Sequence, residues 1–280
     1  MTVIEIDITS EELEDRKERI EKARQFKTGG RVPVTPWVDN RYFYEKIGTT
    51  MKDVFNDPVR LLEAQLHGQK WMLENIKSDV CDIAVQNWSW FENVREASAL
   101  GCDIDFPSPN QVWIKKPWIE TEKDLLKLSK IDFINNGLHD REIKFRDYMR
   151  RISKDYKVRL KDGFELYPAE NTHLVADMDG PFTLAAEVRG CQRLMEDIVD
   201  KPDFVKKLVD IIAEKEIEWV EYCKKMDGDN STIWLADDYV QFLSPKMYEE
   251  FALPYEKKIR FHFDGYCMFH LCGSSEHPQR

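Results

Sequence analysis

The chain has 280 residues, of which 42% are hydrophobic and 12% aromatic, and its formal net charge is −11. This composition excludes a disordered protein and is sufficient for one large α/β domain or two smaller ones. The acidic balance, without a basic stripe to neutralise phosphates, argues against a nucleic-acid partner. No apolar run is long enough to span a bilayer, and the N-terminus is acidic where a secretory leader would be basic. We therefore expect a cytoplasmic protein with no membrane partner, in which the six cysteines are reduced.

Residues 1–30 are predicted to form a helical appendage to a single domain that covers residues 31–280. Thr9 and Glu12 have the spacing of a capping box, which marks the start of a helix. That helix, over residues 10–27, is highly charged and has only a thin apolar stripe. We therefore expect it to be mostly solvated or to pack on a partner.

Strand-like and helix-like segments alternate along the rest of the chain. The strands are predicted from short apolar runs. The helices are predicted from capping residues, among them Asp57 and Ser244, and from apolar side chains at helical spacing. The predicted strands cover residues 31–37, 82–88, 172–177, 232–237 and 266–272. The predicted helices cover residues 58–76, 92–100, 121–128, 139–157, 181–197, 202–226 and 245–255, and an irregular hairpin is predicted over residues 102–120.

Strands that alternate with helices form parallel βαβ units, so the expected fold class is α/β. In parallel barrels the functional site is built from residues at the carboxyl ends of the strands. At those ends the sequence places Asn40 with Arg41, Asn87 with Trp88, Asp177 with Asp179, Asp237 with Asp238, and His270 with Cys272. Polar residues that recur at the same end of successive strands predict a site there.

His270 and Cys272 give the sharpest chemical signal. Side chains alternate along a strand, so these two residues point to the same side. A neutral imidazole and a thiolate at this spacing form half of a zinc site, whereas a catalytic zinc needs three protein ligands and an open position. Cys267 is an odd number of residues away and should face the other side, and His277 lies in a tail with no predicted structure.

The other strand-end residues each have two interpretations. Asp237 and Asp238 could face a substrate, or could cap a helix or be solvated. Arg41 could bind a substrate carboxylate through two parallel hydrogen bonds, or could pair with the neighbouring Asp39. Trp88 could line a flat apolar pocket or belong to the core.

Two segments resemble the uroporphyrinogen decarboxylase superfamily. They are Asp-Gly-Pro-Phe at residues 179–182 followed by Arg189-Gly190, and Asp237 followed by Leu-Ser-Pro at 243–245, Phe251 and Pro-Tyr at 254–255. The resemblance runs from about residue 32 to residue 273 and implies a (β/α)8 TIM-type barrel. Only about five strands are predicted in this chain, so the expected barrel is truncated at its C-terminus, with the last strands missing.

Within that superfamily, the porphyrin decarboxylases carry an arginine-rich N-terminal signature. The corresponding residues 36–44 contain a single arginine, which argues against porphyrin decarboxylation because one arginine cannot pair with many carboxylates. The His-x-Cys-Gly sequence at residues 270–273 is similar to that of the corrinoid-linked methyltransferases. In that branch the histidine and the cysteine bind zinc together with a later cysteine.

The resemblance implies zinc as a cofactor and a corrinoid carried by a partner protein. The implied substrate is a small methylated compound, either a methoxylated aromatic or a methylamine-like molecule. His270 and Cys272 are then the metal ligands, and Asp237 is the catalytic strand-end acid. The residues expected to contact the substrate are Arg41, Asn87, Trp88, Asp177 and Asp238.

Two alternatives stay open from the sequence. One is a metal-free decarboxylase that acts through Arg41 and Asp237. The other is an inactive, truncated remnant that binds a homologous partner through an exposed barrel edge.

Overall fold

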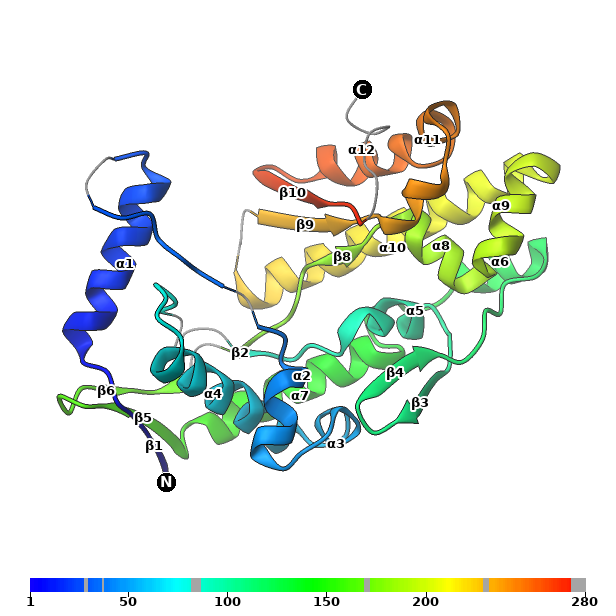
Figure 1. Cartoon of the computed structure of the whole chain (residues 1–280). Coiled ribbons are helices and arrows are strands. Elements are labelled where there is room, and N and C mark those ends of the chain that lie inside the picture. The colour runs from blue at the N-terminus through cyan, green and yellow to red at the C-terminus, as the bar shows by residue number, and fades with distance from the viewer. Residues whose placement is uncertain (28–29, 37, 82–86, 169–171, 229–231, 273–280) are drawn as a thin grey trace. The chain divides into compact units, whose positions relative to one another are not determined.

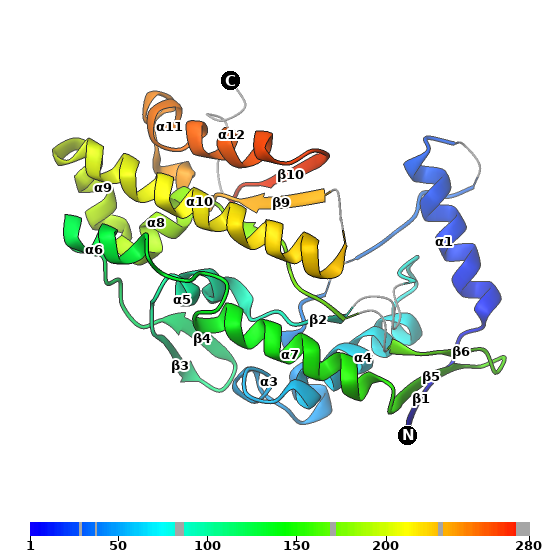
Figure 2. The same cartoon turned by 180° about the vertical axis from the view of Figure 1, so that it is seen from behind.

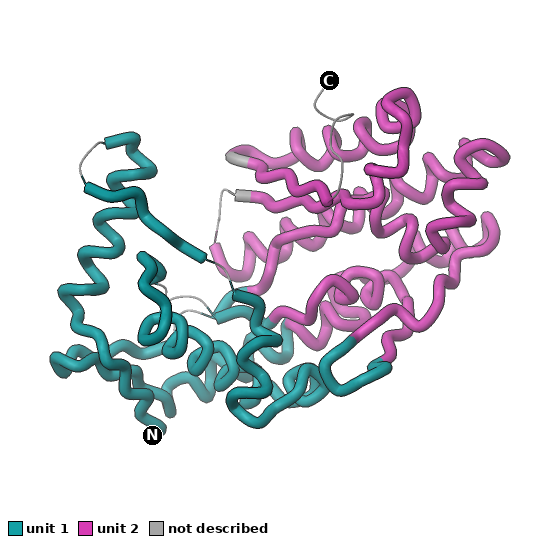
Figure 3. Tube along the Cα trace, viewed as in Figure 1, with its two compact units in different colours: residues 1–89, 106–111, 143–173 teal, residues 90–105, 112–142, 174–280 magenta. Residues whose placement is uncertain are grey.

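The computed structural model describes residues 1–27, 30–36, 38–81, 87–168, 172–228 and 232–272. The chain divides into two compact units (Figure 3). Unit 1 contains residues 1–89, 106–111 and 143–173, and unit 2 contains residues 90–105, 112–142 and 174–280. Within the described ranges, no helix combines the length and the apolar character that a membrane crossing requires.

Unit 1 contains a three-stranded sheet in the order β1-β5-β6 (Figure 1). β1 (Thr2–Ile6) runs parallel to β5 (Tyr156–Leu160), and β6 (Glu165–Leu166) runs antiparallel to β5. Ile4 and Ile6 are buried while the residues between and before them are exposed, which is the alternation expected of a strand with one face on a core.

The charged N-terminal helix forms as predicted. α1 (Ser10–Arg24) begins with the complete capping box of Thr9 and Glu12, and Leu13 is its buried residue. Ser10 also binds the carboxylate of Asp162 through its backbone N–H and its hydroxyl, at 2.8 and 2.6 Å. The expectation of a helical appendage missed β1, which makes residues 2–6 part of the sheet of unit 1.

The helices of unit 1 follow from local capping signals. They are α2 (Arg41–Tyr44), η1 (Glu45–Ile47), α3 (Met51–Val54) and α4 (Pro58–Asn75). The Asp57 carboxylate accepts hydrogen bonds from the backbone N–H groups of Val59 and Arg60, as the sequence predicted for this cap. The strand predicted over residues 31–37 is wrong for residues 31–36, because Pro33 and Pro36 have no N–H to donate to a neighbouring strand.

A second, two-stranded sheet in unit 1 pairs β2 (Asn87–Trp88) with β7 (Thr172–His173) in parallel. The predicted strand over 82–88 lies outside the described residues except at 87 and 88. α7 (Gly137–Ser153) precedes β5, so the predicted helix over 139–157 ends four residues early. The last residues of that prediction alternate in burial as a strand does.

The predicted hairpin is present as the two-stranded sheet of β3 (Ile104–Ser108) and β4 (Gln111–Ile114). The helices that belong to unit 2 are η2 (Glu92–Val94), α5 (Arg95–Ala99), α6 (Glu122–Leu128), α8 (Pro181–Arg189), α9 (Cys191–Asp200), α10 (Pro202–Asp227), η4 (Asp238–Phe242), α11 (Pro245–Phe251) and α12 (Leu253–His262). The helix predicted over 181–197 is divided by Gly190, whose φ of 92° lies outside the helical region.

The sheet of unit 2 has the order β10-β9-β8 and is parallel throughout. Its strands are β8 (Met178–Asp179), β9 (Thr232–Ala236) and β10 (Tyr266–His270). α10 and α12 lie alongside this sheet (Figure 2). The core between them is formed by the apolar residues Met178, Ala213, Ile217, Val220, Ile233, Leu235, Ile259 and Phe263. Burial of these side chains fixes the sheet against the helices, since each large one contributes about 1.5–3 kcal/mol.

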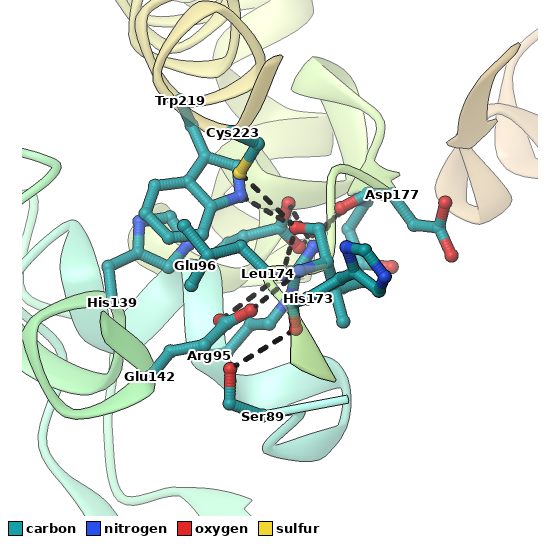
Figure 4. Close-up of polar contacts among 12 residues, drawn as sticks. Ser89, Arg95, Glu96, His139, Glu142, His173, Leu174, Asp177, Trp219 and Cys223 are labelled. Carbon is teal, nitrogen blue, oxygen red and sulfur yellow. Dashed lines mark hydrogen bonds and ion pairs between the residues drawn. The ribbon is translucent and has the colours of Figure 1, made fainter. Parts of the chain in front are cut away.

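The strand predicted over residues 172–177 is instead divided into β7 and β8, because side chains satisfy the backbone between them. The Asp227 carboxylate accepts from the N–H of Leu174 at 2.6 Å, and Glu142 accepts from that of Val175 at 2.9 Å. Arg95 donates to the carbonyl oxygens of Val175, at 2.8 Å, and of Asp177 (Figure 4). These bonds replace the partners that a neighbouring strand would have supplied.

The described strands lie in four small sheets, and none of these sheets closes into a barrel. The α/β class predicted from the sequence is confirmed, with parallel pairing in both units.

Candidate metal centre

The carboxyl ends of β8, β9 and β10 meet at one edge of the parallel sheet of unit 2. Asp179 of β8 and His270 of β10 are both in register with the last residue of β9. Asp237 and Asp238 follow β9 directly, and Cys272 lies two residues beyond the end of β10. The expected gathering of polar residues at strand ends is therefore present for these three strands.

Asp238, His270 and Cys272 form a compact cluster at this edge, with one ligand atom from each side chain within 4.8 Å of the others. Nε2 of His270 is 3.3 Å from Sγ of Cys272 and 3.8 Å from Oδ1 of Asp238. The backbone N–H of Cys272 donates to Oδ1 of Asp238 at 2.8 Å, which fixes the carboxylate beside the thiol. Across the described residues, this is the one set of three His, Cys, Asp or Glu side chains close enough to share a metal ion.

The cluster is accessible from solvent. The side chains of His270 and Asp238 are 46% and 29% exposed, and Cys272 is exposed. The indole of Trp234 lies nearly parallel to the imidazole of His270, with ring centroids 6.2 Å apart. Burial and the neighbouring Asp238 carboxylate raise the pKa of the Cys272 thiol. The thiol is therefore protonated at neutral pH, and a metal ion would displace its proton on binding.

The chemistry of these three donors fits zinc. Zinc accepts imidazole nitrogen, thiolate sulfur and carboxylate oxygen, and its catalytic sites have three protein ligands and one open position. Cys267 packs against the apolar core of unit 2, on the other side of β10, as the alternation of strand side chains predicted. His277 lies outside the described residues. Asp238 was predicted to bind substrate, whereas the structure places it beside the two predicted metal ligands.

Asp237 is next to Asp238 in the chain but is fully buried. Its carboxylate accepts hydrogen bonds from the backbone N–H groups of Phe182 and Thr183, at 3.3 and 2.7 Å, and from the Thr183 hydroxyl at 2.7 Å. These N–H groups belong to the first turn of α8, so Asp237 caps that helix from another element. Gly180 makes this possible, because a Cβ at residue 180 would lie 2.3 Å from Cβ of Asp237.

Several buried carboxyl groups surround Asp237. The hydroxyl of Tyr248 donates to Oε2 of Glu256 at 2.5 Å, and both oxygens of the fully buried Glu216 have no hydrogen-bond partner in the described structure. Burial raises the pKa of Asp237 to about 6, and burial together with the charge of Asp237 raises the pKa of Glu256 to about 8. Burial and neighbouring acids likewise raise the pKa of Glu216. No local pattern predicts this group, because Glu216, Asp237 and Glu256 come from α10, the end of β9 and α12, which are far apart in the chain.

Asp179 is the further acid at the sheet edge. Its backbone N–H donates to Glu96 at 3.1 Å, and burial together with the charges of Glu96 and Glu187 raises the pKa of its side chain. Asp177 lies two residues before Asp179, and its carbonyl oxygen accepts a hydrogen bond from Arg95. Arg95 itself is buried between Glu96 and Glu142, at 3.4 Å from each (Figure 4).

The remaining predicted site residues belong to unit 1. Arg41 pairs with Asp39, through Nε at 2.9 Å and Nη2 at 2.7 Å, which is the second interpretation that the sequence allowed. Asn87 is fully buried. The backbone N–H and carbonyl of Trp88 bind the side-chain amide of Gln65 at 2.7 and 2.6 Å, and its ring contacts that of His173 with centroids 5.9 Å apart.

The parallel sheet of unit 2 carries acid, histidine and cysteine side chains at its carboxyl edge. This places the protein among the α/β proteins whose functional site lies at the carboxyl ends of the strands. The sequence profile of the family described as uroporphyrinogen decarboxylase (URO-D) matches residues 15–279. The chain belongs to this family, which confirms the resemblance found in the sequence.

The chain is similar to two proteins of Methanosarcina mazei. A curated protein described as methylcobamide:CoM methyltransferase MtbA is 27% identical over 105 residues, which cover 36% of this chain and 31% of that protein. The match therefore spans about a third of the length of that relative. A solved structure described as a methyltransferase has a TM-score of 0.63 at 15% identity and covers 92% of this chain and 70% of its own. That likeness shows the shared fold.

Proposed function

We propose that this protein binds zinc through Asp238, His270 and Cys272 and takes part in methyl transfer between a small methylated compound and a corrinoid protein. The observation that carries the proposal is the convergence of the three donor atoms within 4.8 Å at the carboxyl edge of the sheet. Membership of the URO-D family and the similarity to a methylcobamide methyltransferase support the same chemistry. The finer fold that we propose is the (β/α)8 barrel, of which β8, β9 and β10 would be one arc.

Zinc bound there would act as a Lewis acid or would hold a substrate thiol in its thiolate form. The residues of the chain would prepare the site for it. The N–H of Cys272 holds the Asp238 carboxylate in place, and Trp234 packs beside the His270 ring. The exposure of His270 and Cys272 leaves room for a substrate and for a partner protein to approach. We propose cytoplasmic localisation, a compartment in which the six cysteines of the chain would be reduced.

The zinc site is tested by measuring the metal content of the purified protein by mass spectrometry. We expect about one zinc per chain in the wild type and a loss of most of it in His270→Ala and Cys272→Ser. His262→Ala is the matched control, because His262 is also a surface histidine, with 41% of its side chain exposed, and its Nε2 contacts Glu221 and does not belong to the cluster. Full zinc content in His270→Ala would refute the proposed site.

Methyl transfer is tested separately with methylcobalamin and a thiol acceptor, following the absorbance change as the cobalt loses its methyl group. We expect turnover by the zinc-loaded wild type and at least a tenfold loss in Cys272→Ser, about the effect of removing a metal ligand. Activity toward a carboxylated substrate that survives Cys272→Ser would instead support the metal-free decarboxylase.

A further inference from the structure

A pocket of about 570 Å³ lies on unit 1, well away in sequence from the candidate metal centre. It is formed by one side of α1, by residue 31 and by residues 77–78. Its ionisable lining consists of the cations Arg16, Arg19, Arg31 and Lys77 and the acids Glu12 and Asp15. None of the residues so far assigned to a function contributes to it.

The charge of this pocket is opposite to that of the chain. Four cations face two acids, in a protein whose formal net charge is −11. One of the two acids is already engaged, because Glu12 accepts hydrogen bonds from the N–H and the hydroxyl of Thr9 at 2.7 and 3.2 Å. Cations placed together repel one another, and this cost is offset when an anion binds between them.

A buried carboxylate, that of Asp79, holds two of the arginines in position. The side chain of Asp79 is fully buried, and it binds Arg19 and, at 2.5 and 2.8 Å, two nitrogens of Arg31. Asp79 is fixed in turn by the N–H of Val34 at 2.8 Å. Arg16 donates to the carbonyl of Val80 at 3.0 Å. Each guanidinium has five N–H donors and uses only some of them here, so donors remain to face the pocket.

We propose that this pocket binds a small polyanion through Arg16, Arg19, Arg31 and Lys77. The ligand class is a molecule with two or more phosphate or carboxylate groups, because guanidinium groups bind both in a bidentate manner. The volume is sufficient for a compact metabolite of this kind. The alternative explanation for these cations is purely structural: Asp79 binds arginines of both segments and thereby holds α1 against residues 31–34. That explanation accounts for Arg19 and Arg31, and the bond from Arg16 to Val80 ties α1 to the segment of Asp79, but neither contact accounts for Lys77 or for the remaining donors of Arg16.

The proposal is tested by isothermal titration calorimetry of the full chain, with inorganic pyrophosphate and citrate as separate probes. We expect at least one probe to bind with a Kd below about 1 mM at low ionic strength, and more weakly as salt is added. Stronger binding of pyrophosphate would assign the ligand to phosphorylated compounds, and stronger binding of citrate would assign it to polycarboxylates.

Arg16→Gln and Lys77→Gln are each expected to weaken binding by about three- to tenfold, since each removes one charge and its donors. Lys22→Gln is the matched control, because Lys22 is on the same helix, pairs with Glu18 and does not line the pocket. Circular dichroism checks that all three variants retain the wild-type fold. Failure of both probes to bind the wild type, or equal affinities in the wild type, Arg16→Gln and Lys77→Gln, would overturn the proposal. Zinc content is unaffected by either result, so this test is independent of the metal centre.

Discussion

Buried carboxyl groups have cationic neighbours in unit 1 and acidic neighbours in unit 2. In unit 1, Asp79 is fully buried and is contacted by two guanidinium groups and a backbone N–H. In unit 2, the equally buried Glu216 has no hydrogen-bond partner in the described structure and lies near further acids, Asp237 and Glu256 among them. Burial alone raises the pKa of a carboxyl group in either place. The direction of the net change is therefore decided by the neighbours.

The pKa values follow this difference. At Asp79, burial raises the pKa, but the hydrogen bonds from Arg31, Val34 and Arg19 together lower it by more. The net result is a pKa of about 2. At Glu256, burial and the charge of Asp237 act in the same direction and raise the pKa to about 8. Ionised Asp79 therefore stabilises unit 1, whereas ionisation of Glu256 would destabilise unit 2.

Asp237→Ala tests the acids of unit 2 and should have the largest effect. It leaves the N–H groups of Phe182 and Thr183 buried without an acceptor, so we expect a loss of about 2–4 kcal/mol in the free energy of unfolding. Urea denaturation followed by circular dichroism measures it. Asp264→Ala is the control, since Asp264 is exposed and its loss should cost less than about 1 kcal/mol. Equal losses in the two variants would show that Asp237 does not cap α8.

Asp79→Ala tests the ion pairs of unit 1. Arg19 and Arg31 are partly exposed and can be solvated once Asp79 is removed, so we expect a smaller loss, of about 1–3 kcal/mol at neutral pH. The pKa of Asp79 is lowered in the folded state, so its contribution is present above pH 3.8 and is lost as the pH falls to about 2. Denaturant curves in this acidic range should be less pH-dependent in Asp79→Ala than in the wild type or in Asp15→Ala. An unchanged acid dependence would contradict the role of Asp79.

Glu256→Gln should give the smallest change and one of opposite sign. The pKa of Glu256 is raised in the folded state, so its stabilising contribution is lost as the pH rises from 4.5 through about 8. The melting temperature of the wild type should therefore fall toward the upper end of this pH range. In Glu256→Gln this fall should be smaller by roughly a few degrees. Glu250→Gln is the control, because the pKa of Glu250 is lowered by its hydrogen bond to Lys206. The same pH dependence in Glu256→Gln as in the wild type would refute the raised pKa.

Local signals predicted much of the fold. The caps at Thr9, Asp57 and Ser244 were predicted from neighbouring residues and are present, because a cap depends only on the next few N–H groups. The strands were predicted less well, because a strand needs partners from elsewhere in the chain. Residues 31–36 have an apolar pattern but two prolines, and residues 174–177 have their backbone groups bound by side chains.

The candidate site shows the same division. That His270 and Cys272 point to one side follows from their spacing, and their 3.3 Å contact confirms it. That Asp238 joins them depends on the register of β9 against β10, which the sequence of neither strand contains. The capping role of Asp237 depends on the close approach of Gly180, 57 residues earlier in the chain, as the numbering of the two residues shows.

The pairing of β1 with β5 has a consequence for how the protein folds. Thr2 is in register with Tyr156, so this pair closes a loop of about 154 residues. Closing so long a loop has a large entropic cost before any contact repays it, and contacts of this kind slow folding. During synthesis, β1 leaves the ribosome before β5 and cannot pair with it until β5 has been made. The sheet of unit 1 should therefore form late, after the helices that lie between β1 and β5 in the chain have begun to pack.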